Sequence, residues 1–293
     1  MKYSLENELL RLTVTTDGAQ VCSVVHKTDG VEHIWQADPK VWGQHSPILF
    51  PYAGRLTDGV LTAKGGTYAG GPHGFARRME HPLLEQTPDA ITLELTDSEE
   101  TRKLWPYRFS LQSRFTLEGD CLAHTLTVEN RDEEPMPFGI GFHPAFALPF
   151  DQNHTSADYE LRFSQPESPL CLGTLPSGLL HGDCYYLGRN IQSLDLGGRL
   201  FANDSHCIVN LSSQTLGVYE KDSGRAVVCE IADFPYTLLW GKDIRPLPFV
   251  CIEPWCSLPS PEWGSTEWNE KPAAAILAPG EKWSITLKTH FVR

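Results

Sequence analysis

The chain has 293 residues, of which 41% are hydrophobic, and it carries a formal net charge of -13 at pH 7. This much apolar sequence can build a sizeable core, whereas the acidic balance argues against nucleic acid or an anionic membrane as the main partner. No apolar run reaches the roughly 18 residues of a membrane span, and the N-terminal sequence MKYSLENELLRLTV lacks a hydrophobic signal region.

Alternation of apolar and polar residues, which is typical of half-buried strands, recurs along the chain. It predicts single strands at 9–15 (LLRLTVT) and 91–95 (ITLEL). It also predicts two hairpins: 109–117 with 121–129, joined at Gly119, and 215–220 with 225–231. The last predicted strand is WSITLKTHF (283–291).

Helical patterns are sparse. The best is DSEETRKLW (97–105), with Asp97 or Ser98 as its cap and Pro106 to end it. Long loops are expected in the stretch 151–200. The many turns, with 24 Gly and 22 Pro, favour one all-β domain over residues 1–293, an antiparallel β-sandwich with few short helices. A division into two domains is the alternative.

Eight cysteines are scattered without a CxxC pair, and several lie in strand-like runs such as HCIVNL and AVVCEI. Buried, reduced thiols are therefore expected rather than a disulfide framework. We expect a cytoplasmic protein that is a monomer or a homodimer.

Two polar side chains follow residues that restrict the backbone. Arg55 comes after ILFPYAG, and its planar guanidinium suits vicinal hydroxyls, a carboxylate or a phosphate. His73 lies between Pro72 and Gly74, which indicates a positioned ring. A surface arginine paired with an acid and a structural histidine are the simpler alternatives.

The same pattern returns further along the chain. His143 lies in GIGFHPAF, again beside Gly, Phe and Pro. In FVCIEPW, four apolar residues run into Glu253, so burial is expected to raise the pKa of its carboxyl. Trp255 offers a face on which a sugar could stack, although a core tryptophan is equally ordinary. A strand-end salt bridge is the alternative for Glu253.

Other chemistries find little support. His45, His73, His143 and Glu253 could supply metal ligands, but their spacings match no metal signature. The chain has no GxSxG nucleophile elbow and no GxxxxGK[ST] or GxGxxG loop. We therefore expect neither a metal nor another cofactor.

The sequence resembles the aldose 1-epimerases (galactose mutarotases), and within them the LacX-like branch. The resemblance is carried in order by PYAGRLTDG, HGFAR, GFHPAF and CIEPW. Longer similar stretches are DSEETRKLWPYRFSLQSRFTL, LFANDSHCIVNL, DFPYTLLWGK and LAPGEKWSITLKTHF.

The resemblance implies a galactose-mutarotase-like sandwich with an open sugar cleft and a cofactor-free reaction. Glu253 matches the catalytic base at the C1 hydroxyl, and His143 matches the acid at the ring oxygen. Arg55, His73 and Asp204 match substrate-binding residues. Such a buried Glu and His would be poised near neutral pH for proton transfer.

The identity of the sugar stays open, because Trp240 and the residues after Glu253 depart from well-characterised galactose mutarotases. The alternatives are a non-catalytic carbohydrate-binding or sensing protein, a polysaccharide-acting enzyme and a hexose-phosphate mutarotase. Arg77 and Arg78 could hold a phosphate in the last case, but pairing within the fold is the preferred interpretation for both.

Overall fold

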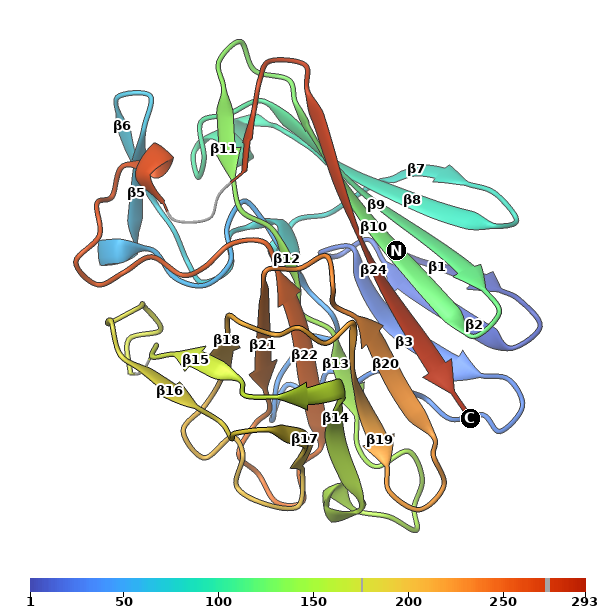
Figure 1. The fold of residues 1–293 in the computed structure, drawn as a ribbon. Coiled ribbons are helices and arrows are strands. Elements are labelled where there is room, and N and C mark those ends of the chain that lie inside the picture. The colour runs from blue at the N-terminus through green and yellow to red at the C-terminus, as the bar shows by residue number, and fades with distance from the viewer. Residues whose placement is uncertain (175, 272–274) are drawn as a thin grey trace.

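The computed structural model describes residues 1–174, 176–271 and 275–293, and antiparallel strand pairs dominate it (Figure 1). The predicted all-β class is therefore confirmed. Residue 175, in the stretch where long loops are expected, lies outside the described residues.

The largest sheet has nine strands in the order β17-β14-β19-β20-β24-β10-β9-β8-β7. Their bounds are β7 (Leu83–Gln86), β8 (Ala90–Thr96), β9 (Phe109–Glu118), β10 (Cys121–Asn130), β14 (Tyr159–Glu167), β17 (Ile191–Asp195), β19 (Thr215–Glu220), β20 (Ala226–Glu230) and β24 (Lys282–Val292). Both predicted hairpins are confirmed: β9 pairs with β10, and β19 pairs with β20. Every second side chain of β10 is buried, which explains the alternation in its sequence.

The second sheet runs in the order β16-β15-β18-β21-β22-β12-β4, and β13 also pairs with β22. Its strands are β4 (Ile48–Leu49), β12 (Gly141–Phe142), β13 (Ala145–Ala147), β15 (Leu170–Leu172), β16 (Cys184–Tyr186), β18 (His206–Ile208), β21 (Tyr236–Trp240) and β22 (Phe249–Trp255). All seven residues of β22 are buried. This central strand is the rigid element on which the site is built.

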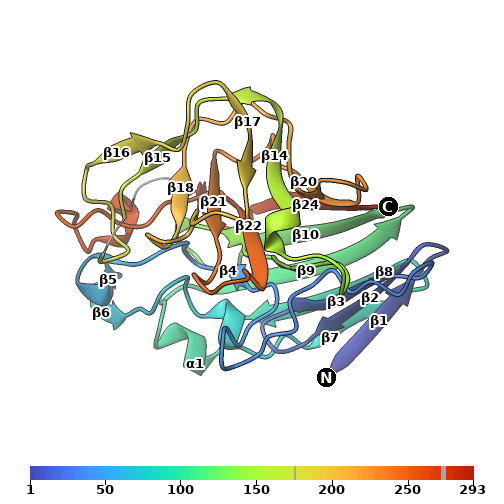
Figure 2. The same ribbon diagram turned by 90° about the horizontal axis from the view of Figure 1, so that it is seen from below.

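Three smaller sheets complete the fold. They are formed by β1 (Lys2–Glu6), β2 (Leu10–Thr15) and β3 (Gln20–His26); by β5 (Val60–Ala63) and β6 (Gly66–Ala69); and by β11 (Met136–Phe138) and β23 (Ala275–Leu277). Figures 1 and 2 show β1 to β3 beside the β8–β9 end of the nine-stranded sheet.

Only the first turn of the predicted helix forms. α1 spans Glu99–Arg102, and Ser98 caps it, because its side chain accepts from the Thr101 N–H while the Thr101 side chain accepts from the Ser98 N–H. The chain then turns so that Trp105 is fully buried in the core. The other helices are single 3₁₀ turns at Thr57–Gly59, Ala76–Arg78, Ser156–Asp158 and Trp268–Glu270.

The expectation of long loops across 151–200 is wrong in part. β14 is a nine-residue strand of the large sheet, and β15, β16 and β17 lie in the same stretch. Pro166 and Pro169 interrupt the sequence alternation here, and the pairing of β14 with β17 shifts register between Arg162 and Glu167. A strand with such an irregularity gives little periodic signal in the sequence, even though β14 is paired on both sides.

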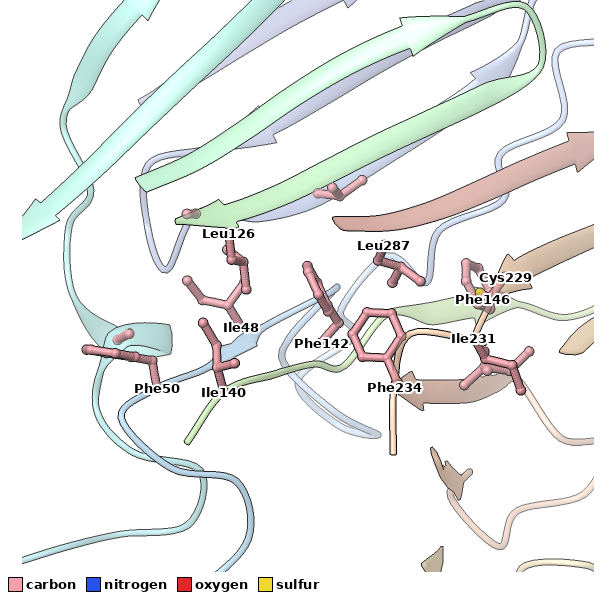
Figure 3. Packing of buried hydrophobic residues seen from close by; sticks show 14 of the residues in the cluster. Ile48, Phe50, Leu126, Ile140, Phe142, Phe146, Cys229, Ile231, Phe234 and Leu287 are labelled. Atoms are coloured by element: carbon pink, nitrogen blue, oxygen red, sulfur yellow. The ribbon is translucent and has the colours of Figure 1, made fainter. Parts of the chain in front are cut away.

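The space between the two large sheets is filled by apolar side chains. Figure 3 shows Ile48 and Phe142 on the side of the eight-stranded sheet, facing Leu126 and Leu287 of the nine-stranded sheet. Each such side chain stabilises the fold by about 1.5–3 kcal/mol on burial. This shared core confirms the predicted β-sandwich.

All eight cysteines lie within the described residues, and none forms a disulfide. Five of them are buried, as the sequence predicts. No helix in the described part of the chain has the length and apolar character required to cross a bilayer.

Candidate active site

The central strand β22 presents a different chemistry on each face. Val250 and Ile252 belong to the main core, while Cys251 and Glu253 alternate with them and project to the other side. Glu253 and Trp255 line a cavity of about 300 Å³. Strand β22 therefore places the carboxyl group of Glu253 at the wall of this cavity.

The cavity gathers segments that are far apart in the sequence. It is lined by all six predicted site residues: Arg55, His73, His143, Asp204, Glu253 and Trp255. The spacing of the short motifs along the sequence does not predict that they meet. The fold brings these side chains into one cavity.

His143 and Glu253 lie next to each other in the cavity. The distance between His143 Nε2 and Glu253 Oε2 is 3.3 Å. Glu253 is fully buried and His143 is 7% exposed. Their positions are fixed by backbone contacts: Glu253 lies opposite Leu238 of β21, and the His143 N–H donates to Pro47 O at 3.0 Å. An imidazole and a carboxyl group thus face one cavity together.

Burial moves the two pKa values in opposite directions. It raises the pKa of Glu253 well above the ordinary value; the charge of Asp204 adds to the rise, whereas Trp255 and Arg77 oppose it. Burial, helped by the charge of Arg77, lowers the pKa of His143 to about 3. Both shifts favour the uncharged forms, which are a protonated Glu253 carboxyl and a neutral His143 ring.

One expectation about these residues is confirmed and one is wrong. The pKa of Glu253 is raised, as its apolar context predicts. The pKa of His143 does not lie near neutrality, because its ring is desolvated and Nδ1 has no hydrogen-bond partner among the described residues.

Trp42 orients the His143 ring, and sequence reasoning missed it. The two rings are stacked, with centroids 5.1 Å apart and an interplanar angle of 22°. Trp42 is itself held by its backbone, because its N–H donates to Asp38 O at 2.8 Å and its carbonyl accepts from Trp35 Nε1 at 2.8 Å. The available signal was weak: a tryptophan between β3 and β4 in a segment without alternation.

His73 is fixed by a tight turn. Its N–H donates to Gly54 O at 2.7 Å, and the Gly54 N–H donates to His73 Nδ1 at 3.1 Å. Because Nδ1 accepts, the ring proton lies on Nε2, which is then available as a donor. Gly74 has a φ of +68°, and a Cβ there would lie 2.1 Å from Phe50 O, so the turn requires glycine. The predicted positioning of His73 by its neighbours is confirmed.

Arg55 and Asp204 bring opposite charges to the cavity. Arg55 is exposed and forms no ion pair within the described residues, so the alternative of a structural surface pair is not realised. Asp204 has a left-handed φ of +68°, and its Oδ1 accepts from Trp240 Nε1 at 2.7 Å. Trp240, noted in the sequence as a departure from related enzymes, therefore holds Asp204.

The expectation that Arg77 pairs within the fold is wrong. Arg77 lines the cavity, its Nε is buried without a hydrogen-bond partner among the described residues, and no acidic group there pairs with it. Burial lowers the pKa of Arg77 to about 10. Arg78 also forms no ion pair in the described part of the chain. The site thus has two cations, Arg55 and Arg77.

Other titratable groups near or away from the cavity have clearer structural roles. His45 does not line the cavity, and its Nδ1 bonds Trp35 O at 2.7 Å. Asp151, His154 and Glu220 form a second cluster, but Arg225 pairs with Asp151 and Glu220 there, so a cation is already in place.

His143, Cys251 and Glu253 form a buried cluster of possible metal ligands.

Known proteins are similar to the chain over nearly its whole length. A profile of the family described as aldose 1-epimerase matches residues 1–290. Protein LacX (chromosomal) of Lactococcus lactis subsp. lactis is 32% identical over 287 residues, which cover 95% of each chain.

Solved structures agree with this similarity. A galactose mutarotase related enzyme from Lactobacillus acidophilus is 28% identical, with a TM-score of 0.94 over 100% of this chain and 98% of that one. A galactose mutarotase-like protein from Lactobacillus casei ATCC 334 is 27% identical, with a TM-score of 0.89 over 99% of both chains. The resemblance seen in the sequence is confirmed.

Proposed function

The chain belongs to the aldose 1-epimerase family, and from that premise we propose that it is a cofactor-independent mutarotase that interconverts the α and β anomers of a hexose. The observation that carries the proposal is the 3.3 Å contact between His143 Nε2 and Glu253 Oε2 in a cavity open to a small ligand. Opening a hemiacetal requires one group that removes a proton and another that delivers one.

The reaction uses the proton of the Glu253 carboxyl, while the neutral His143 ring keeps its own proton on Nδ1. Transfer of that proton from Glu253 Oε2 to His143 Nε2 gives a carboxylate and an imidazolium without changing the net charge. The carboxylate then takes the proton of the C1 hydroxyl, and the imidazolium donates to the ring oxygen. The C1–O5 bond breaks and C1 becomes an aldehyde.

Reclosure restores the starting state. After rotation about C1–C2, the carboxyl of Glu253 returns its proton to O1, and His143 Nε2 takes the proton of the C5 hydroxyl. The imidazolium then passes that proton back to the Glu253 carboxylate, so that Glu253 is again protonated and His143 is again neutral. Every proton is accounted for within the pair and the sugar, so no cofactor enters the reaction. Because the pair has few hydrogen bonds of its own, sugar hydroxyls would supply the missing partners of both groups.

The remaining cavity residues bind and orient the sugar in this proposal. Arg55 and His73 Nε2 donate hydrogen bonds from one side, and Asp204 accepts from hydroxyls on another. Trp255, which meets the His73 ring edge to face at 5.5 Å, provides an apolar wall. Fixing the sugar between donors and acceptors supplies the orientation that solution lacks.

Glu253→Gln tests the proposal directly. The amide keeps the shape but cannot accept the proton, so exchange between α and β glucose or galactose should fall at least about 100-fold while sugar binding persists. Two-dimensional NMR exchange spectroscopy measures the rate, and Glu118→Gln, at an exposed strand end, is the matched control.

The same measurement separates the alternatives. Sugar binding without added exchange in the wild-type protein would identify a sensor rather than an enzyme. Shortening of oligosaccharides would identify a polysaccharide-acting enzyme. Unchanged exchange in Glu253→Gln would remove Glu253 from its role.

A hexose phosphate is the second candidate substrate, and one observation favours it. Arg77 is an unpaired, half-buried cation at the cavity wall, and a guanidinium binds phosphate through paired donors. Comparison of glucose with glucose 6-phosphate decides between the two. If the phosphate is preferred, Arg77→Gln should remove the preference and leave exchange of free glucose measurable.

The cytoplasm is the compartment that we infer for this activity. Eight free cysteines, one of them exposed at position 184, are typical of a reducing environment. Fluorescence microscopy of the tagged full-length protein in its own host tests this location.

A further inference from the structure

Three side chains of the types that bind metals, those of His143, Cys251 and Glu253, lie together beside the cavity. Cys251 and Glu253 are two residues apart on β22 and share one face of the strand, and His143 enters from the turn between β12 and β13. One ligand atom from each lies within 4.8 Å of the other two. Cys251 does not line the cavity, so its thiol lies behind the His143–Glu253 pair.

The polar atoms of this cluster are buried and poorly satisfied. Cys251 and Glu253 are fully buried, and His143 is 7% exposed. Neither carboxyl oxygen of Glu253 has a hydrogen-bond partner among the described residues, and the Nδ1 atom of His143 has none there either. Buried polar groups normally have partners, so the Glu253 carboxyl is free to bind a ligand.

Their chemistry suits a zinc-like ion. Thiolate, imidazole nitrogen and carboxylate oxygen are the ligands of tetrahedral zinc, whose bond lengths of about 2.0–2.3 Å place ligand atoms about 3.6 Å apart. The His143–Glu253 distance of 3.3 Å already meets this spacing. The thiol needs a shift of up to about an ångström, and the cavity offers the fourth position to water or a sugar hydroxyl.

Charge balance permits the ion in a buried place. A Cys251 thiolate and a Glu253 carboxylate together carry the two negative charges that balance a divalent cation, and a neutral His143 imidazole adds none. Because metal binding releases the protons of its ligands, the buried site need not gain net charge. Of the neighbouring charges, Asp204 favours the cation and Arg77 opposes it.

We propose that Cys251, His143 and Glu253 form a binding site for a thiophilic divalent cation such as Zn²⁺, and that the bound ion inhibits the protein. The ion occupies the atoms between which the catalytic proton moves, so it prevents exchange of anomers. This second half rests on the proposed function, whereas the binding site itself does not. A sugar in the cavity and the ion compete for the same groups.

Titration of the reduced, metal-free, full-length protein with Co²⁺ tests the site, because thiolate-to-cobalt charge transfer gives a near-ultraviolet absorption band. The band should appear with one Co²⁺ per chain, disappear on addition of Zn²⁺, and be absent in Cys251→Ser and Cys251→Ala. Cys229→Ser is the matched control, since Cys229 is also buried and its sulfur contacts Thr289 away from the cavity. Circular dichroism identifies any variant that has not folded.

Inhibition is measured separately by NMR exchange, with each variant's rate in Zn²⁺ divided by its own rate without metal. The inhibitory Zn²⁺ concentration should rise at least about tenfold in Cys251→Ala relative to wild type and Cys229→Ser. A band that persists in both folded Cys251 variants, or no band in the wild type, overturns the site. A band with full exchange activity overturns inhibition, and a band in a protein without exchange activity overturns the mutarotase proposal instead.

Discussion

At the scale of single residues, the orientation of His143 depends on an aromatic stack instead of a hydrogen bond. Most catalytic histidines are fixed by an acceptor at the second ring nitrogen, but Nδ1 here has none among the described residues. Trp42 covers the ring on one side, and Trp240 and His73 meet it edge to face at 5.9 and 5.7 Å.

This arrangement makes Trp42 a positioning residue that can be tested. Trp42→Leu should lower the kcat of anomer exchange about tenfold, because the imidazole gains freedom to rotate. Trp42→Phe keeps a stacking surface and should restore most of the rate. Loss of sugar binding with unchanged kcat in Trp42→Leu would show that Trp42 contacts the substrate and does not orient His143.

The opposed pKa values of the pair predict a broad pH optimum. Acid adds a second proton to the pair and removes the base, whereas alkali removes its one proton and so removes the acid. Because burial lowers the pKa of His143 to about 3, the acid limb of kcat/KM should lie well below pH 6.5, the ordinary histidine value. NMR exchange rates from pH 4 to 9 measure the profile, and an acid limb at pH 6.5 would contradict this assignment.

Residues differ in how far the sequence reveals them. Arg55, His73, His143 and Glu253 were found because each lies beside glycine or proline in a short motif. Trp42 was not found, and Arg77 was expected to pair within the fold, because stacking on a ring and the lack of an acidic partner exist only in three dimensions.

At the scale of elements, the turn at His73 is held in place by hydrogen bonds to the residue that follows strand β4. Phe50 O accepts from Phe75 N at 3.0 Å and from Ala76 N at 3.2 Å, so the turn is bound closely to the residue that follows β4. A side chain at Gly74 would enter this contact.

Gly74→Ala should destabilise the protein by at least about 2 kcal/mol, through backbone strain and collision with Phe50 O, and it should lower exchange by displacing His73. Gly119→Ala is the matched control, since Gly119 also has a positive φ (+57°) but open space around it. Urea denaturation measures both variants. Equal losses of stability in the two would show that the collision is relieved without cost.

Elements were predictable where the alternation of apolar and polar residues is long and unbroken, which the register shift in β14 prevents. The ten-residue strands β9 and β10 alternate for long enough to be recognised, and the turn between them contains Gly119. β4 and β12 have two residues each, too few for any period, although β12 pairs with both β4 and β22 beside the site. Strands this short form because they pair with neighbouring strands, which the sequence pattern does not show.

At the scale of the whole molecule, we propose that residues 1–293 form one domain. The main buried cluster includes residues from the three-stranded sheet and from both large sheets, such as Leu12, Leu126 and Ile252. Limited proteolysis tests this, because two domains would leave a stable fragment after cleavage of a connecting segment.

Three buried histidines predict loss of stability in mild acid. Burial lowers the pKa of His33, His81 and His124 to about 4, 4 and 3. As pH falls below about 6.5, protons bind the unfolded chain first, so stability is full above that pH and is lost progressively down to about pH 4. At pH 5 each histidine costs about 2 kcal/mol.

His124→Leu should reduce this dependence, because the ring of His124 packs between Phe115 and Phe142 and leucine needs no proton there. The difference in unfolding free energy between pH 7.5 and pH 5, measured with urea, should shrink by about 2 kcal/mol relative to wild type. An unchanged difference would mean that His124 does not titrate on unfolding in this range.

The position of β24 has a consequence for synthesis of the protein on the ribosome. Residues 282–292 form a strand in the middle of the nine-stranded sheet, between β20 and β10. β10 is translated by residue 130, so one of its edges waits unpaired while the next 151 residues emerge. The nascent sandwich therefore closes late, and we expect its yield to depend on chaperones that shield open strand edges during translation.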